Sequence, residues 1–370
     1  MKKIFLIMLT VLLVGAFVLG GCAEPAPEPA PAPTPAPTPA PAPAEKTLTL
    51  RIQSAYPRGD LSMEGLAYFA EAAAKYSNGT LIIEVFAEPE IVGMFQVQDA
   101  VVGGTLDLAM DPGGFWSGRG VKVGDIEFGL PYGFLIPEKA TFEDKANEIR
   151  RFFFEDGLVD ILRAEYAKQG VYWLDMHSYG PVPFLIGTEK AANAFKGTVD
   201  DIKDLIIRTD SLWMEWHNAM GMTGVDMGPM DAYTGLQTGT VDAHIWDVSV
   251  YIGMGFEEVA PYWIRGEEND HALGHILVNM DIWNSLSANQ KDALAKAGEE
   301  YWHLLLADYS QAMKDVRALV ADGTVIEVQM SDAILALHKK TAYELWDEVA
   351  ARDDACAQAV QLLKTWRGID

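Results

Sequence analysis

The sequence predicts an α/β fold of two similar lobes with a helical C-terminal region. Its 370 residues exceed the roughly 250–300 residues at which a single hydrophobic core stops growing. Strand and helix patterns alternate after residue 46, as is typical of layered α/β domains. A helix-to-strand motif near residue 100 comes back about 135 residues later, which predicts that the two lobes are built alike.

The composition narrows the classes of function. The chain carries 53 acidic and 28 basic side chains, a formal net charge of −25. Nucleic acid is a poor partner, because neutralising phosphates requires a basic surface. The two cysteines, Cys22 and Cys356, cannot build a disulfide framework. The sequence also lacks GxSxG, GxxxxGK[ST] and GxGxxG, so no nucleophile elbow, P-loop or dinucleotide fingerprint is present.

Residues 1–21 have the pattern of a secretory signal peptide. Lys2 and Lys3 precede the apolar run Ile4–Val18, and Leu19-Gly20-Gly21-Cys22 follows. A basic start, a short apolar core and small residues at the end mark such a signal. The last four residues resemble the lipobox of bacterial lipoproteins, which makes Cys22 the predicted lipidation site. An ordinary cleaved signal is the alternative.

Residues 22–46 are predicted to form a tether that starts at the acylated cysteine. Proline occupies every second position from Pro25 to Pro43, and proline excludes both helix and sheet ladders. A stiff polyproline II segment is expected. No later apolar run reaches the ~20 residues that span a bilayer. We therefore expect a periplasmic or extracytoplasmic protein that is anchored to a membrane by its lipid and does not cross it.

The globular part begins with a strand, a helix and a second strand. Residues 47–52 alternate polar and apolar side chains, which predicts a half-buried strand. Leu61–Tyr76 carries apolar residues at helical spacing and ends at Asn78-Gly79, a helix stop. Residues 81–86 follow as the next strand.

The repeated motif indicates the second lobe. Residues 98–107 and 233–242 each have a helical pattern stopped by glycine, then Gly-Thr-x-Asp and a strand; chance similarity is the alternative. The motif strands are expected at 108–110 and 243–246. Further strands are expected at 171–174, 205–208 and 275–278. Helices are expected over 287–317 and 330–366, with a turn at Asp322-Gly323.

These elements predict the boundaries of the lobes. We expect lobe 1 mainly over 47–174 and lobe 2 mainly over 175–285. Residues 286–370 are expected to form a helical region that spans both lobes.

Arg208 is the first candidate for ligand binding. It ends the apolar strand 205–207, where a guanidinium must be paired internally or be kept for an anionic ligand. A small carboxylate approaching so acidic a protein needs a local cation, and a guanidinium offers bidentate geometry. A structural ion pair with Asp or Glu is the alternative.

Two other groups of side chains deserve testing. Asp270-His271-x-x-x-His275 is the nearest approach to a metal motif, and it supports the hypothesis of an extracytoplasmic metal-dependent hydrolase. Aromatic residues gather where loops should meet a cleft, although for any single ring a place in the core is the stronger expectation: Phe115, Trp116, Trp213, Trp216, Trp246 and Tyr251.

Three stretches in order, 90–101, 202–208 and 236–243, carry a family resemblance. Through them the chain from Leu48 to about Trp366 resembles the DctP-type substrate-binding subunits of tripartite ATP-independent periplasmic (TRAP) transporters. The run 255–262 is similar to the branch that binds 2-oxoacids and hydroxyacids. The resemblance implies a two-lobed periplasmic binding protein fold with a ligand cleft between the lobes. It also implies a non-catalytic protein that delivers a small organic acid to a membrane permease.

The resemblance also assigns residues. The arginine that pairs with the substrate carboxylate maps onto Arg208. A Na⁺ or Ca²⁺ ion bridging the ligand is implied near Trp246, with Asp247 and Asp270 as its carboxylates, although Pro181-Val182 stand where that branch has a Gln ligand. The other implied cleft residues are Phe115, Trp116, Tyr179 and Trp213. A ligand sensor for a membrane receptor is a further alternative.

Overall fold

The computed structural model describes residues 45–136, 139, 141–180, 185–247, 249–267 and 271–369. The predicted signal peptide, Cys22, the proline-rich part of the tether, Pro181-Val182 and Asp270 lie outside the described residues. Within the described part, no helix combines the length and the apolar character needed to cross a membrane.

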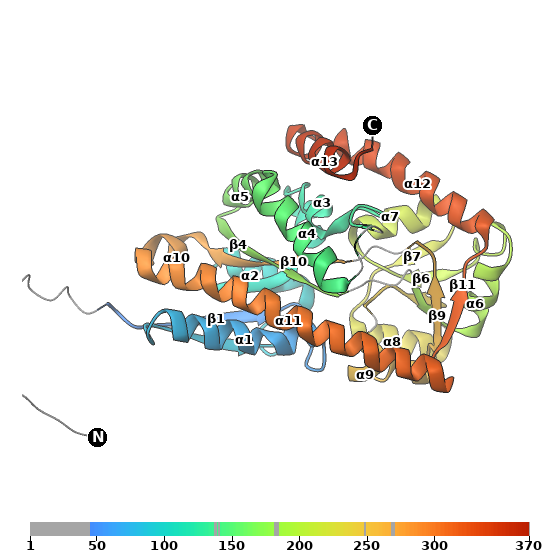
Figure 1. Ribbon diagram of the computed structural model, residues 1–370, viewed down its shortest axis with the longest axis horizontal. Coiled ribbons are helices and arrows are strands. Elements are labelled where there is room, and N and C mark those ends of the chain that lie inside the picture. The colour runs from blue at the N-terminus through green and yellow to red at the C-terminus, as the bar shows by residue number, and fades with distance from the viewer. Residues whose placement is uncertain are drawn as a thin grey trace, which may run out of the picture. The chain divides into compact units, whose positions relative to one another are not determined.

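Residues 45–369 fold into two α/β lobes, each built on one sheet (Figure 1). The sheet of lobe 1 has the order β2-β1-β3-β10-β4, and that of lobe 2 has the order β11-β9-β5-β8-β6-β7. The strands of lobe 1 are β1 (Leu48–Ser54), β2 (Leu81–Phe86), β3 (Leu108–Pro112), β4 (Val171–Ser178) and β10 (Leu273–Asn279). Those of lobe 2 are β5 (Leu185–Gly187), β6 (Ile206–Arg208), β7 (Thr223–Val225), β8 (Ala243–His244), β9 (Tyr262–Arg265) and β11 (Ile326–Gln329).

Helices cover these sheets. The helices of the first half are α1 (Leu61–Tyr76), α2 (Val97–Val102), α3 (Gly124–Gly129), α4 (Phe142–Glu155), α5 (Leu158–Ala167) and α6 (Glu189–Lys196). Those of the second half are α7 (Ser211–Ala219), α8 (Pro229–Thr238), α9 (Val250–Gly253), α10 (Met280–Ser285), α11 (Ala288–Asp322), α12 (Asp332–Ala350) and α13 (Asp354–Arg367). Three short 3₁₀ turns are η1 (Met94–Gln96), η2 (Gly113–Arg119) and η3 (Phe256–Glu258).

The repeated Gly-Thr-x-Asp motif has the same structural job in both lobes. In lobe 1, Asp107 accepts the backbone N–H of Arg51 at 2.7 Å, and its own N–H donates to the Arg51 carbonyl. In lobe 2, Asp242 accepts the N–H of Ile206 at 2.9 Å and donates to the carbonyl of that residue. Each aspartate therefore locks the start of one strand to its parallel neighbour, satisfying backbone groups that a strand end leaves open.

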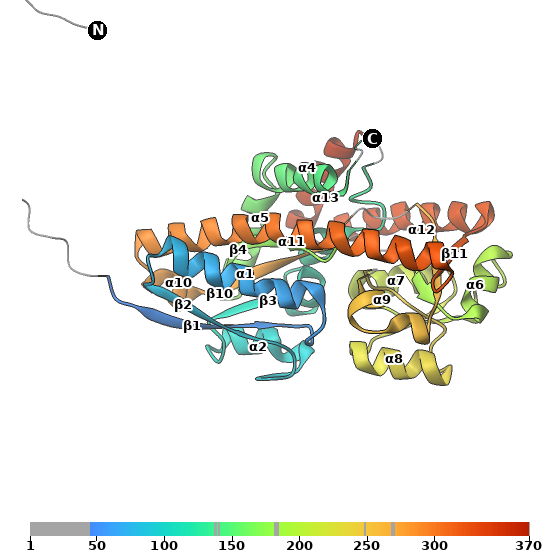
Figure 2. The same cartoon turned by 60° about the horizontal axis from the view of Figure 1, so that its bottom comes forward.

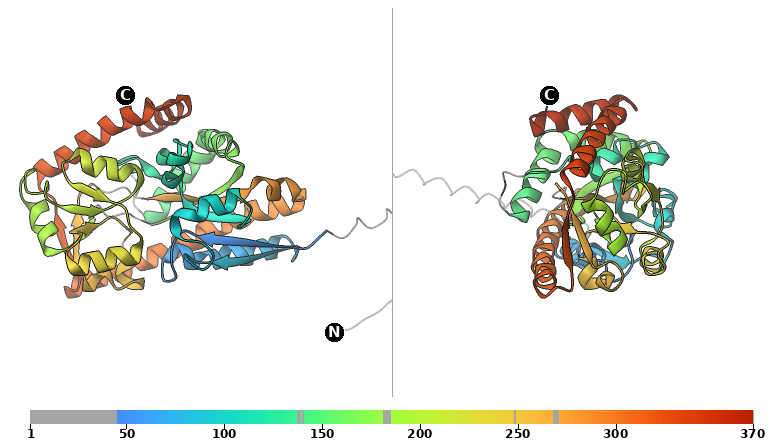
Figure 3. Two further views of the ribbon diagram at one scale, coloured as in Figure 1. Left: turned by 180° about the vertical axis from the view of Figure 1, so that it is seen from behind. Right: turned by 90° about the vertical axis from the view of Figure 1, so that its right-hand side faces the viewer.

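The C-terminal region joins the two lobes. Helix α11 packs against α1 and β4 of lobe 1 and against α9 of lobe 2 (Figure 2). Its start is fixed by a capping box, in which Ser287 and Gln290 satisfy each other's backbone N–H groups. Helix α12 then packs on α7 of lobe 2, and α13 packs on α3 and α5 of lobe 1. In the left view of Figure 3 these two helices, in red, run from lobe 2 to lobe 1.

Two predicted elements differ from the structure. The helix expected over 330–366 is two helices, because Asp353 caps a new start by accepting the N–H of Cys356. The strand expected over 243–246 ends at His244. Its last two predicted residues, Ile245 and Trp246, lie instead in the loop that follows, which places them at the pocket described below.

Candidate functional site

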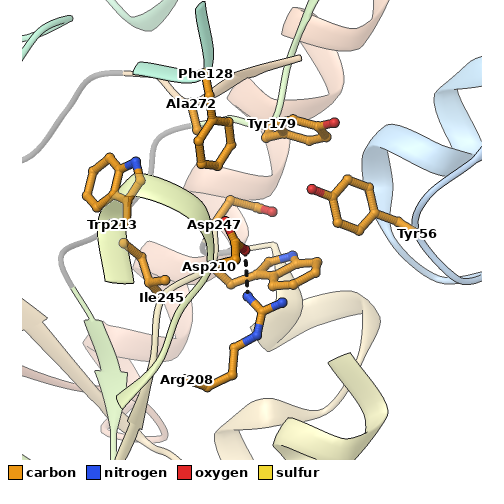
Figure 4. Close-up of a pocket in the computed structure, with 10 residues that line it drawn as sticks. Tyr56, Phe128, Tyr179, Arg208, Asp210, Trp213, Ile245, Asp247 and Ala272 are labelled. Atoms are coloured by element: carbon orange, nitrogen blue, oxygen red, sulfur yellow. Dashed lines mark hydrogen bonds and ion pairs between the residues drawn. The ribbon is translucent and has the colours of Figure 1, made fainter. Parts of the chain in front are cut away.

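A pocket lies between the lobes, and both contribute to its wall (Figure 4). The cavity volume, counted as the space that the centres of water molecules can occupy, is about 40 Å³. One water needs only about 10–15 Å³ of such space, so the pocket has room for a small molecule. Lobe 1 supplies Tyr56, Phe128, Tyr179 and Ala272. Lobe 2 supplies Arg208, Asp210, Trp213, Ile245, Trp246 and Asp247.

Arg208 stands at the carboxyl end of β6, between β7 and β8, the edge where α/β sheets commonly bind ligands. It is 1% exposed. Its Nε donates to the carbonyl of Met227 at 2.9 Å, and its Nη1 to Asp210 Oδ2 at 3.3 Å. The guanidinium also lies 4.9 Å over the ring of Trp246, a cation–π distance.

The third guanidinium nitrogen of Arg208, Nη2, remains available to a ligand. Nη2 is buried and has no hydrogen-bond partner within the described residues. Burying such a donor without a partner is costly. A bound anion at this point would relieve that cost.

Two carboxylates share the pocket with Arg208. Burial raises the pKa of Asp210, and the neighbouring Arg208 charge only partly opposes this. Burial, together with the charge of Asp60, raises the pKa of Asp247 to about 8. Asp60 caps α1 by accepting hydrogen bonds from the N–H groups of Ser62 and Met63. It also accepts a hydrogen bond of 3.3 Å from the indole Nε1 of Trp246, which belongs to the other lobe.

Aromatic side chains form the rest of the wall. Tyr56 makes edge contacts with Tyr179 and Trp246, with ring centroids 5.0 and 5.1 Å apart. Trp213 Nε1 donates to the carbonyl of Gly129 at 3.1 Å, which joins α7 of lobe 2 to the end of α3 in lobe 1. The pocket is therefore apolar, with a few charged groups on one side.

The structure brings together most of the residues singled out from the sequence. Arg208, Trp213, Trp246, Asp247 and Tyr179 all line the pocket.

Two predicted cleft residues lie elsewhere. Trp116 is fully buried in lobe 1 and donates Nε1 to Asp111 at 2.8 Å, and Phe115 packs against Phe95 with ring centroids 5.2 Å apart. The expectation that they line the cleft is corrected, because the chain turns into η2 directly after β3 and carries the Trp116 ring into the core.

Sequence reasoning missed Tyr56, Phe128, Asp210, Ile245 and Ala272. Tyr56 follows β1 and Ile245 follows β8, so their places at strand ends were available as a signal. Asp210 lies two residues after Arg208, so its closeness in sequence to the predicted binding residue was a further signal. Phe128 and Ala272 reach the pocket only through packing between distant segments.

The two histidines of the metal-like pattern serve separate structural networks. His275 lies on β10 between two carboxylates, with Nδ1 2.9 Å from Glu127 and Nε2 3.0 Å from Asp111. His271 contacts the hydroxyl of Ser178 at 3.0 Å and stacks on Phe142. Within the described residues there is no group of three or more His, Cys, Asp or Glu side chains that could hold a metal ion; the imidazole of His275 already bonds both of its carboxylate neighbours. The hydrolase hypothesis therefore gains no support from this region.

A second charged contact joins the lobes away from the pocket. Arg352, between α12 and α13, donates Nη1 to Asp125 of lobe 1 and Nη2 to Glu215 of lobe 2, both at 2.6 Å. Asp125 is 2% exposed, and burial raises its pKa to about 6. One guanidinium thus ties both lobes in the arrangement seen here.

Replacing Arg352 by alanine is expected to lower the free energy of unfolding by about 1–3 kcal/mol, because Asp125 stays buried without its cation. Glu215→Gln breaks only the contact with the exposed partner and should cost less than about 1 kcal/mol. Urea unfolding measures the change in the free energy of unfolding for both variants. Arg58→Ala, which removes an exposed pair with Glu90, is the control. Equal losses for Arg352→Ala and Arg58→Ala would contradict the buried role of Arg352.

Comparisons with known proteins agree with this architecture. The family model described as bacterial extracellular solute-binding protein, family 7, matches residues 52–353. A monocarboxylate 2-oxoacid-binding periplasmic protein of Nostoc sp. is 23% identical over 324 residues, covering 86% of this chain and 83% of the relative.

Two solved structures share the fold. One is a TRAP periplasmic solute binding protein from Pseudoalteromonas atlantica with bound sodium and pyruvate, at TM-score 0.78, 19% identity, and 87% and 94% coverage of the two chains. The other is a TRAP transporter solute binding protein from Bordetella bronchiseptica with calcium and picolinate, at TM-score 0.77, 20% identity, and 87% and 92% coverage. The predicted two-lobed fold is confirmed, and the chain belongs to family 7 of the bacterial extracellular solute-binding proteins.

Proposed function

We propose that the protein is the extracytoplasmic receptor of a TRAP transporter, which captures a small organic acid in the pocket and delivers it to the membrane permease. The observation that carries the proposal is Arg208, a buried guanidinium with a free Nη2 facing a pocket lined by both lobes. Pyruvate and picolinate, the ligands of the two structural neighbours, are small carboxylates of the expected kind. The protein acts as a carrier and not as an enzyme.

The geometry explains how a carboxylate is held. Met227 and Asp210 fix two nitrogens of the guanidinium, and Trp246 supports its face. The group is therefore oriented before the ligand arrives, which reduces the entropy lost on binding. A ligand oxygen at Nη2 completes the hydrogen bonds of Arg208. Closure of the two lobes then excludes water from this charge-assisted contact and strengthens it.

The protein is proposed to work at the membrane surface. Removal of residues 1–21 leaves Cys22 as an acylated first residue, and residues 22–46 connect it to the globular part. A lipid anchor of this kind holds the receptor close to the permease that it serves.

We propose that a Na⁺ or Ca²⁺ ion bridging the ligand would lie beside Asp247, because the two structural neighbours hold sodium or calcium together with their carboxylate ligands. Ca²⁺ takes six to eight oxygen ligands, and of the three residues assigned to the cation only Asp247 presents a carboxylate within the described part of the chain. Trp246 directs its indole N–H to Asp60, and Asp270 lies outside the described residues. Of these three residues, the described part of the chain therefore offers the ion the carboxylate of Asp247, while the carboxylate of the ligand itself is held by Arg208.

A ligand screen tests the function. Thermal unfolding of the purified mature protein would be followed with monocarboxylates, 2-oxoacids, hydroxyacids, amino acids, dicarboxylates and sugars, each with and without EDTA. A ligand at 100 times its dissociation constant stabilises the folded state by about 2.7 kcal/mol, so a carboxylate class should raise the melting temperature clearly. A response to sugars alone, or to none of the compounds, would overturn the proposal.

A further inference from the structure

Beside the pocket, two glycines of opposite lobes approach each other through their backbones. Gly253 ends α9 of lobe 2, and a Cβ added to it would stand 2.5 Å from the carbonyl oxygen of Gly59 in lobe 1. Ordinary contacts of a Cβ begin near 3.4 Å, so glycine is needed for this approach. Gly59 directly precedes Asp60, which accepts the indole N–H of Trp246, a pocket residue of lobe 2. The spacing of the lobes at this contact therefore reaches the pocket wall through one neighbouring residue.

A second glycine contact joins the lobes at the start of α7. Gly114, in the 3₁₀ turn η2 of lobe 1, lies against Ser211, the first residue of α7 in lobe 2. A Cβ added to Gly114 would stand 2.8 Å from the Cβ of Ser211 and 3.4 Å from the ring of Phe128. Phe128 lines the pocket, and so does Asp210, which precedes Ser211. This contact also leaves no room for a side chain, and it also adjoins the pocket wall.

The two glycine contacts fix the width of the pocket. Figure 4 shows Phe128 and Tyr179 of lobe 1 opposite Arg208 of lobe 2, with the cavity between them. The cavity volume of about 40 Å³ holds only while the lobes keep this spacing. Close-packed atoms yield little to compression, so the lobes cannot approach further once the glycines touch. A ligand too large for the pocket must therefore keep these contacts from forming.

We propose that Gly253 and Gly114 are specificity-determining residues, which select short acids by letting the lobes close to one fixed distance. The inference rests on the proposed function, since it takes a carboxylate held at Arg208 as the ligand. A short acid allows full closure, so its binding gains the contacts between the lobes as well as its own. A longer acid holds the lobes apart and forfeits the contacts between them. The affinity is therefore expected to fall steeply as the acid becomes longer.

Gly253→Ala tests the inference because it adds one methyl group at an exposed contact. Gly253 and Gly59 are both exposed, and the backbone of Gly253 lies outside the left-handed region, so an alanine there is opposed only by the facing lobe. Gly114→Ala makes the same change at the second contact. Gly118→Ala is the matched control, since Gly118 is an exposed residue of the same η2 turn whose added Cβ meets no described atom within 4 Å.

The measurement is calorimetric titration of the purified mature protein with unbranched monocarboxylates, 2-oxoacids and 2-hydroxyacids of two to eight carbons. The wild-type protein is expected to bind one short acid best and the acid two carbons longer about tenfold more weakly or worse. Gly253→Ala should weaken binding of the short acid by about fivefold or more, the lower end of the cost of overpacking. The longer acid should bind nearly as before, because its complex never brings residue 253 against Gly59. The preference for the short acid therefore shrinks by the same factor.

The stability of the ligand-free variants separates this role from a structural one. Gly253→Ala should melt at the wild-type temperature, because the lobes can separate at this contact without unfolding, and Gly118→Ala should match the wild type in stability and preference. An undiminished preference in Gly253→Ala would overturn the inference, and so would an equal loss for short and long acids or a failure of this variant to fold. Failure of every carboxylate to bind the wild-type protein would instead overturn the proposed function itself.

Discussion

Arg208→Gln is expected to weaken ligand binding by about 30-fold or more. Truncating one partner of a buried charge-assisted contact costs about 2–5 kcal/mol, and each 1.4 kcal/mol is a factor of ten in affinity. Glutamine keeps a donor but loses the charge and the geometry that Met227 and Asp210 hold in place. Calorimetric titration with the best ligand of the screen gives the change directly.

The stability of the variant must be measured beside its affinity. Removing the guanidinium leaves Asp210 buried without its cation, and the pKa of that carboxyl is already raised by burial, so some loss of stability at neutral pH is expected. Arg208→Lys keeps the charge and separates the two effects, because lysine cannot reproduce the planar fork. Arg265→Gln, which breaks the pair with Glu327 on the same lobe, should leave affinity unchanged. A folded Arg208→Gln protein that retains its affinity would remove Arg208 from the site.

Local patterns in the sequence predicted the parts of the fold that depend on near neighbours. The strand and helix between Leu48 and Tyr76 follow from periodicity and from the stop at Asn78-Gly79, and Asp107 and Asp242 marked equivalent points of two lobes. Arg208 was identifiable because a charge at the end of an apolar strand has few explanations. In each case the sequence pattern lies within a few residues of the element or side chain that it predicts.

Contacts between distant segments limited the prediction of the site. Trp116 lies in η2 shortly after β3, near the strand end where ligand-binding residues are usual, yet its indole N–H donates to Asp111 in the core. Phe128 reaches the pocket from α3, and nothing in its local sequence indicates this. Asp247 was predicted as a cation ligand, but only the structure shows that it shares the pocket wall with Asp210, a carboxylate that the sequence did not single out.

Asp111 also contacts His275, and the replacement of this histidine is the second change expected to have a large effect. Replacing His275 by glutamine is expected to lower the free energy of unfolding by about 3–5 kcal/mol at pH 7, since it removes the charged partner of buried ions. His275, Asp111 and Glu127 are all fully buried. Trp116 and Tyr166 donate further hydrogen bonds to the two carboxylates, but neither carries a positive charge. Urea unfolding measures the loss, and His303→Gln, on the exposed side of α11, is the control.

The pH dependence of stability tests the charge on His275 itself. Burial alone would lower its pKa, but the charges of Glu127 and Asp111 outweigh burial and raise the pKa to about 9, above the usual value of about 6.5 for an unfolded chain. A raised folded-state pKa stabilises the protein fully below pH 6.5, and this contribution is lost as the pH rises through 9. At 1.36 kcal/mol per unit, the wild-type protein should lose roughly 3 kcal/mol over that range through this group. The His275→Gln protein should lack that part of the slope. Parallel slopes for the two proteins would mean that His275 is neutral between its carboxylates, and that hydrogen bonds alone hold this part of lobe 1 together.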